Sequence, residues 1–101
     1  PKPSKLVIDP IDPTPDQKTT MTVDISSDSD ITKAQIILVT DNDSQTLDLK
    51  LIQGDKQTGI WQTTAKIKDT YLYKYLLNFN LQSSTGTYTG GLTFRQWKNL
   101  N

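Results

Sequence analysis

The stretch YLYKYLLNFNLQ, residues 71–82, decides the fold class. Every odd position in it is aromatic or aliphatic, while Lys74, Asn78, Asn80 and Gln82 stand among the even positions. A two-residue period of this kind is typical of a β-strand that buries one face and exposes the other. The alternation lasts longer here than anywhere else in the chain, and it predicts a long strand.

Shorter segments with the same period lie on both sides of this stretch. Turn-forming residues separate them, including residues 41–44, which we expect to close a hairpin, and the glycine-bounded loop at residues 53–59. Pro10, Pro13 and Pro15 interrupt the opening segment, which favours an edge strand because proline cannot donate to a ladder. The further strands expected, in chain order, are residues 19–25, 31–40, 46–52, 60–68 and 87–97.

Together these segments predict an all-β fold in one domain over residues 1–101, an immunoglobulin-like Greek-key sandwich of about seven antiparallel strands. No helix of ordinary length fits between the strands, and no internal repeat or linker divides the chain. Two pairings stay open for the first strand, Leu6–Ile11. It pairs within its own domain or with another copy, since a proline-flanked edge strand can leave its sheet.

The composition lacks most of the residues that enzymes use for acid–base and nucleophilic chemistry. The chain has no His and no Cys, and its 11 acidic residues are all Asp. General acids, bases and nucleophiles would have to come from Asp, Lys and Tyr, so we do not expect an enzyme. Lys and Arg also number 11, and the resulting net charge of zero does not favour nucleic acid as a partner.

Hydropathy predicts no membrane insertion. No stretch approaches the roughly 20 apolar residues that cross a bilayer as a helix. The chain opens on Pro1, Lys2 and Pro3 and not on a signal peptide, so we interpret it as a mature product or an excised domain.

Four segments carry a resemblance to a known group of domains. They are IDPIDPTPDQ (8–17), VDISSDSDITKAQIIL (23–38), GIWQTTAKI (59–67) and YKYLLNFNLQSSTG (73–86). With them the chain resembles the bacterial and archaeal immunoglobulin-like and fibronectin type III-like domains of secreted enzymes, adhesins and surface-layer proteins. In many such domains the last segment ends in an acidic residue and a Gly-Asn turn. Here Gly86 is present, but the acidic residue and the Asn are missing. The resemblance implies a noncatalytic accessory domain located outside the cell or on its surface.

Apolar residues on strand faces that we expect to be exposed to solvent are the first candidate binding site. Ile37, Val39, Leu72 and Leu76 fall on the solvent sides of their strands, where a patch would dock a neighbouring domain or protein. The alternative is that outer faces of sandwiches commonly carry a few apolar residues without a partner. The leading hypothesis is therefore a noncatalytic module that acts as a spacer or as a protein-docking domain.

Aromatic residues outside the expected core give the second hypothesis. Trp61 and Tyr75 alternate into the core, whereas Tyr71, Tyr88 and Trp97 are expected to be exposed. Exposed aromatic rings stack against sugar faces and also dominate protein interfaces. The alternative function is therefore a carbohydrate-binding module that uses these three residues.

Aspartates before the third expected strand give a weaker metal hypothesis. Asp24, Asp28 and Asp30 lie at one pole of the expected sandwich, where turns can gather the six to eight oxygens that calcium needs. The spacing lacks the central Gly and the closing Glu of a complete calcium loop, and ordinary Asx turns are the alternative. No other cofactor is expected.

Overall fold

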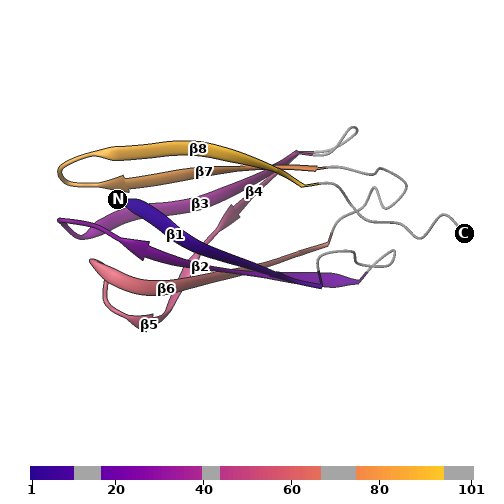
Figure 1. Cartoon of the computed structure of the whole chain (residues 1–101), viewed down its shortest axis with the longest axis horizontal. Coiled ribbons are helices and arrows are strands. Elements are labelled where there is room, and N and C mark those ends of the chain that lie inside the picture. The colour runs from indigo at the N-terminus through magenta and orange to yellow at the C-terminus, as the bar shows by residue number, and fades with distance from the viewer. Residues whose placement is uncertain (11–16, 40–43, 67–74, 95–101) are drawn as a thin grey trace, which may run out of the picture.

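The computed structural model describes residues 1–10, 17–39, 44–66 and 75–94, and these residues form eight strands and no helix (Figure 1). In chain order the strands are β1 (Lys2–Asp9), β2 (Lys18–Ser26), β3 (Ile31–Val39), β4 (Ser44–Asp48), β5 (Lys50–Gly54), β6 (Thr58–Lys66), β7 (Tyr75–Ser83) and β8 (Thr87–Phe94).

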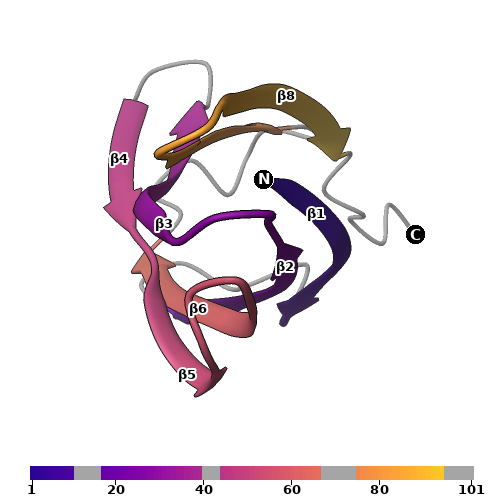
Figure 2. The same ribbon diagram turned by 90° about the vertical axis from the view of Figure 1, so that its left-hand side faces the viewer.

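The strands form two antiparallel sheets that pack face to face (Figure 2). The first sheet has the order β1-β2-β6-β5, and the second has the order β4-β3-β7-β8. The central pair of the first sheet, β2 and β6, runs without a register shift from Lys18↔Lys66 to Ser26↔Thr58. The expected all-β sandwich is therefore the architecture of the described residues.

One expected strand is divided between the two sheets. Residues 46–52 fall partly in β4 and partly in β5, and the chain changes sheets at Leu49. Leu49 is 6% exposed, and its N–H donates to the carbonyl of Ala34 on β3 at 2.9 Å. The described residues therefore contain eight strands and not about seven, because one alternating segment supplies an edge to each sheet.

The core lies between the sheets and is built from one face of each central strand. Burial alternates along β2 and β3 with the period of the sequence pattern, and the odd positions of β7 that are described share it. The inward faces predicted for these strands are thus confirmed where the side chains are described. The buried apolar residues are Met21, Val23, Ile25, Ile31, Ala34, Ile36, Leu38, Leu49, Trp61, Ala65, Leu77, Phe79 and Leu81.

Trp61 of β6 lies in this core, as its alternation predicts, and it is 7% exposed. It stands opposite Val23 on β2 and Leu51 on β5. Its indole N–H is buried without a hydrogen-bond partner among the described residues. An unpaired N–H costs about 1–3 kcal/mol, whereas burying a ring of this size contributes about 4–6 kcal/mol. Packing therefore accounts for a tryptophan at this position.

The first strand pairs within its own chain. β1 runs antiparallel to β2, with Leu6 opposite Val23 and Ile8 opposite Met21, and its register shifts between Pro3 and Lys5. This is one of the two pairings that the sequence left open for Leu6–Ile11, of which Ile11 lies outside the described residues.

Candidate functional site

Three of the four predicted docking residues lie together on the outer face of the β4-β3-β7-β8 sheet. Val39 on β3 stands opposite Leu76 on β7, and Ile37 lies two residues before Val39 on the same side. The side chains are half-buried. Opposed residues of antiparallel strands project to the same face, so the three form one patch. The fourth predicted residue, Leu72, lies outside the described residues.

A row of amide side chains continues this face away from the patch. Asn80 on β7 donates through Nδ2 to Oε1 of Gln35 on β3 at 3.3 Å, and Gln35 donates through Nε2 to Oδ1 of Asp48 on β4 at 2.9 Å. Gln82 donates to Oδ1 of Asn80 at 3.4 Å. The hydrogen bonds fix the orientation of each amide across three neighbouring strands.

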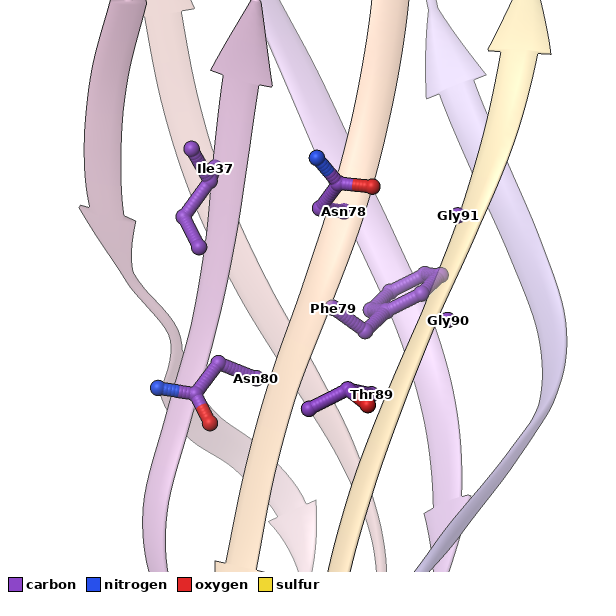
Figure 3. A pocket seen from close by; sticks show the side chains of 7 residues that line it. All are labelled: Ile37, Asn78, Phe79, Asn80, Thr89, Gly90 and Gly91. Atoms are coloured by element: carbon purple, nitrogen blue, oxygen red, sulfur yellow. The ribbon is translucent and has the colours of Figure 1, made fainter.

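A shallow hollow of about 540 Å³ opens between the patch and the amide row (Figure 3). Its floor depends on a glycine, because Gly91 on β8 stands opposite Asn78 on β7. A Cβ at Gly91 would lie 2.5 Å from Oδ1 of Asn78, so a larger residue at this position would displace the Asn78 side chain from the place it has in the hollow. The residues that line the hollow are Ile37, Asn78, Phe79, Asn80, Thr89, Gly90 and Gly91.

The chemistry of the hollow suits binding. Its lining offers the amides of Asn78 and Asn80, the hydroxyl of Thr89 and the aliphatic side chain of Ile37. These groups donate and accept hydrogen bonds or make apolar contacts. The described residues of the lining include no ionisable side chain that would act as a general acid, a general base or a nucleophile. The site therefore suits a partner that presents both polar and apolar groups.

Tyr88 is half-buried and not the exposed ring that the carbohydrate hypothesis expects. It stands opposite the fully buried Leu81, so both residues face inward, and it packs against the core. Its hydroxyl lies over Gly90, where an added Cβ would come within 2.7 Å of Oη. The alternation along β8 places Tyr88 on the inner face, which corrects the expectation. Tyr71 and Trp97 lie outside the described residues.

The structure does not bring the three candidate calcium ligands together. Asp24 is half-buried within β2, whereas Asp28 and Asp30 lie exposed in the following turn. Oδ1 of Asp30 accepts a hydrogen bond from Nε2 of Gln57 at 3.1 Å. Within the described ranges, no group of three or more His, Cys, Asp or Glu residues could hold a metal ion. The calcium hypothesis gains no support from this arrangement.

Three turns meet at one end of the sandwich, which the sequence pattern did not predict. The N–H of Ser27, after β2, donates to the carbonyl of Gln57 in the β5–β6 turn at 2.7 Å. The N–H of Ile31 donates to the carbonyl of Lys56 in the same turn at 3.0 Å. The hydroxyls of Ser29 and Thr85 lie 2.8 Å apart and join the β7–β8 turn. The sequence marks each of these segments as a turn, but their meeting follows from the order of the strands.

Asp55 organises the β5–β6 turn. Its Oδ1 accepts hydrogen bonds from the backbone N–H groups of Gln57 and Thr58, each at 2.9 Å. The bond from Thr58, followed by that from Gln57, lowers the pKa of the Asp55 carboxyl below its ordinary value. These bonds favour the charged form of the carboxylate over the protonated form.

Replacing Asp55 with alanine is expected to remove a stabilisation that depends on pH. Because the pKa is lower in the folded chain, the carboxylate stabilises the fold above the ordinary aspartate pKa of about 3.9, and this contribution is lost as pH falls through the lowered value. Urea unfolding of wild type and Asp55→Ala should differ most near neutral pH and converge in acid. In Asp55→Asn, which keeps Oδ1 as an acceptor without titrating, this acid-dependent loss should be absent. A wild-type advantage over Asp55→Ala that stays constant into acid would contradict the assignment.

Comparison of the chain with protein-family models, with curated proteins and with solved structures finds no match. Within residues 1–10, 17–39, 44–66 and 75–94 there is also no helix with the length and hydropathy needed to span a bilayer.

Proposed function

We propose that the chain is a noncatalytic, immunoglobulin-like module of a secreted or cell-surface protein. It acts as a spacer and docks a neighbouring domain or a partner protein through one face. This docking face comprises Ile37, Val39 and Leu76 together with the adjoining hollow. The grouping of these three residues, which come from two strands far apart in sequence, is the observation that carries the proposal.

The order of the strands supports the immunoglobulin-like assignment. In sandwiches of that type the first, second, fifth and fourth main strands form one sheet, and the third, sixth and seventh form the other. The order β1-β2-β6-β5 and β3-β7-β8 follows this scheme if β4 is an additional edge strand beside β3. The sequence resemblance to extracellular accessory domains points in the same direction and supports the proposed location.

The composition of the docking face matches the anatomy of protein interfaces. Interfaces that form between folded partners place apolar residues at the centre and polar residues, with oriented hydrogen-bonding groups, around them. Here half-buried aliphatic side chains adjoin an amide row whose hydrogen bonds fix its orientation. A partner would cover the remaining apolar surface without stripping water from an ion pair.

A photo-crosslinking amino acid at position 37, in the protein as its own cells make it, is expected to form an adduct with the docked domain or partner. Ile37 is suitable because it lies at the centre of the docking face and is half-buried. Mass spectrometry would identify the adduct. Adding Val39→Lys is expected to reduce its yield by about tenfold, the loss that corresponds to about 1.4 kcal/mol of binding free energy.

Position 22 provides the matched control. Thr22 is also half-buried and lies at the middle of a central strand, but on the outer face of the other sheet. The proposal requires an adduct from position 37 that is absent from position 22. Equal adducts from both positions, or none from position 37, would overturn it.

A further inference from the structure

The described edges of the two sheets differ in how they are protected against pairing with other chains. The edge strands are β1, β5, β4 and β8. Natural edges are blunted by charges, proline, bulges or short length. β1 carries Pro3, charged residues and a register shift. β5 is five residues long, with a register shift between Leu51 and Gln53. β4 is also five residues long, and it ends at Asp48.

β8 has none of these protective features. It is eight residues long, TYTGGLTF, with no charged residue and no proline. Its register with β7 is continuous from Tyr75↔Phe94 to Gln82↔Thr87, so no bulge turns the edge aside. An edge of this length, neutral and regular, is a template for another strand.

The hydrogen bonds of the sheet define which backbone groups of β8 face outward. The N–H of Ser83 donates to the carbonyl of Gly86 at 2.8 Å, which makes this a hydrogen-bonded pair next to the Gln82↔Thr87 pair. Hydrogen-bonded and non-bonded pairs alternate in an antiparallel ladder. The N–H and C=O groups that point away from β7 are therefore those of Thr87, Thr89, Gly91 and Thr93.

We propose that this edge pairs with β8 of a second copy of the chain, antiparallel about a two-fold axis at Gly90. In this register Thr89 of each copy stands opposite Gly91 of the other, and Thr87 stands opposite Thr93. All four residues present backbone groups that point away from β7, and no bond from them to another described residue is seen, so the register forms about eight hydrogen bonds, two for each pair. Residues whose side chains lie on the outer face of one copy stand opposite residues of the same kind in the other copy. The two outer faces therefore form one continuous surface.

The charge pattern favours a second copy as the occupant. A two-fold axis brings the same strand of both copies together, so a strand that carries charges of one sign brings like charges close to each other, which is destabilising where they stand opposite. β1, β4 and β5 each carry Lys or Asp, and β8 carries neither. The net charge of zero adds no long-range repulsion between copies.

Sedimentation equilibrium of the whole chain tests the proposal. From about 10 µM to about 1 mM the average mass of wild type should rise from 11.4 kDa towards twice that value. Thr89→Pro removes an N–H that faces the free edge and bonds nothing within β7, so association should weaken at least about tenfold. Thr89→Val keeps the N–H and the side-chain shape, and it should associate as wild type does. A wild-type mass that stays at 11.4 kDa to 1 mM, or equal weakening by both substitutions, would overturn the proposal.

Hydrogen exchange of the wild-type chain supplies a second readout if Thr89→Pro does not fold. The amides of Thr89 and Gly91 should exchange more slowly at the higher concentration. The amide of Gly90, which faces β7, should change little. Self-association that leaves the exchange of Thr89 and Gly91 unaltered would place the contact elsewhere and overturn the assignment to β8.

Discussion

Leu77→Ala is expected to lower the free energy of unfolding by about 2–5 kcal/mol, the usual cost of truncating a fully buried leucine. Leu77 has no exposed surface and lies at the centre of the core, between the two sheets. Its loss removes apolar contacts and leaves a cavity that close-packed neighbours fill only in part. Urea denaturation followed through the fluorescence of the buried Trp61 would measure the difference.

The preceding residue is a matched control for this substitution. Leu76 is the same residue type on the same strand, but it points to the outer face and is half-buried. Leu76→Ala should cost less than half as much as Leu77→Ala, because solvent can fill the space that it leaves. Equal losses at the two positions would mean that the side chains of β7 do not alternate between a buried inner face and a half-buried outer face.

Gly54→Ala is expected to destabilise the chain by about 2–4 kcal/mol, through backbone strain and overpacking together. Gly54 ends β5 with a φ of 83°, a conformation that side chains disfavour. An added Cβ would also lie 2.4 Å from the carbonyl oxygen of Thr58, and that backbone atom belongs to the paired strand β6. Thermal or urea unfolding would measure the loss.

Gly86 is the comparison for this prediction. It lies just before β8, in the corresponding turn of the other sheet, and among the described residues a Cβ there would meet only Pro1 Cδ, at 4.0 Å. Gly86→Ala should leave stability unchanged or raise it by about 0.4–1 kcal/mol, because alanine reduces the freedom of the unfolded chain. A similar loss at both glycines would mean that neither φ nor crowding distinguishes the two turns.

Alternation was sufficient to predict which face of a strand is buried, and it was correct for the described side chains of the strands in the middle of each sheet. Met21 and Val23 on β2 and Leu81 on β7 are fully buried as their positions predict. Burial on one side imposes a two-residue period on a central strand, and the period is visible in the sequence. The same alternation also applies to Tyr88, which lies at a position of β8 whose side chain faces inward.

Alternation could not predict which sheet a strand joins. The leucines at 47, 49 and 51 keep one period across the break between β4 and β5, because the inner faces of both sheets line the same core. Nothing local marks Leu49 as the crossing point, where its N–H is bonded to the carbonyl of Ala34 on β3. The strand count was therefore one short.

The candidate site was predictable in part for the same reason. The outward positions of Ile37, Val39 and Leu76 follow from alternation within their own strands, and the structure places them side by side. The hollow beside them depends on Gly91 standing opposite Asn78, a register between strands that no single segment encodes. The meeting of the three turns depends on strand order in a similar way.

The direction of the outermost strands has a mechanical consequence. β1 starts at the end of the sandwich where Lys2 stands opposite Ser26, and β8 finishes at the far end, where Phe94 stands opposite Tyr75 (Figure 1). Tension applied between these two points drags β1 along β2 and β8 along β7. Ladder hydrogen bonds run perpendicular to the strands, so each ladder is loaded in shear and its bonds share the force instead of opening one after another. A sandwich pulled in this way resists unfolding under tension, which is the mechanical property that the proposed spacer role requires.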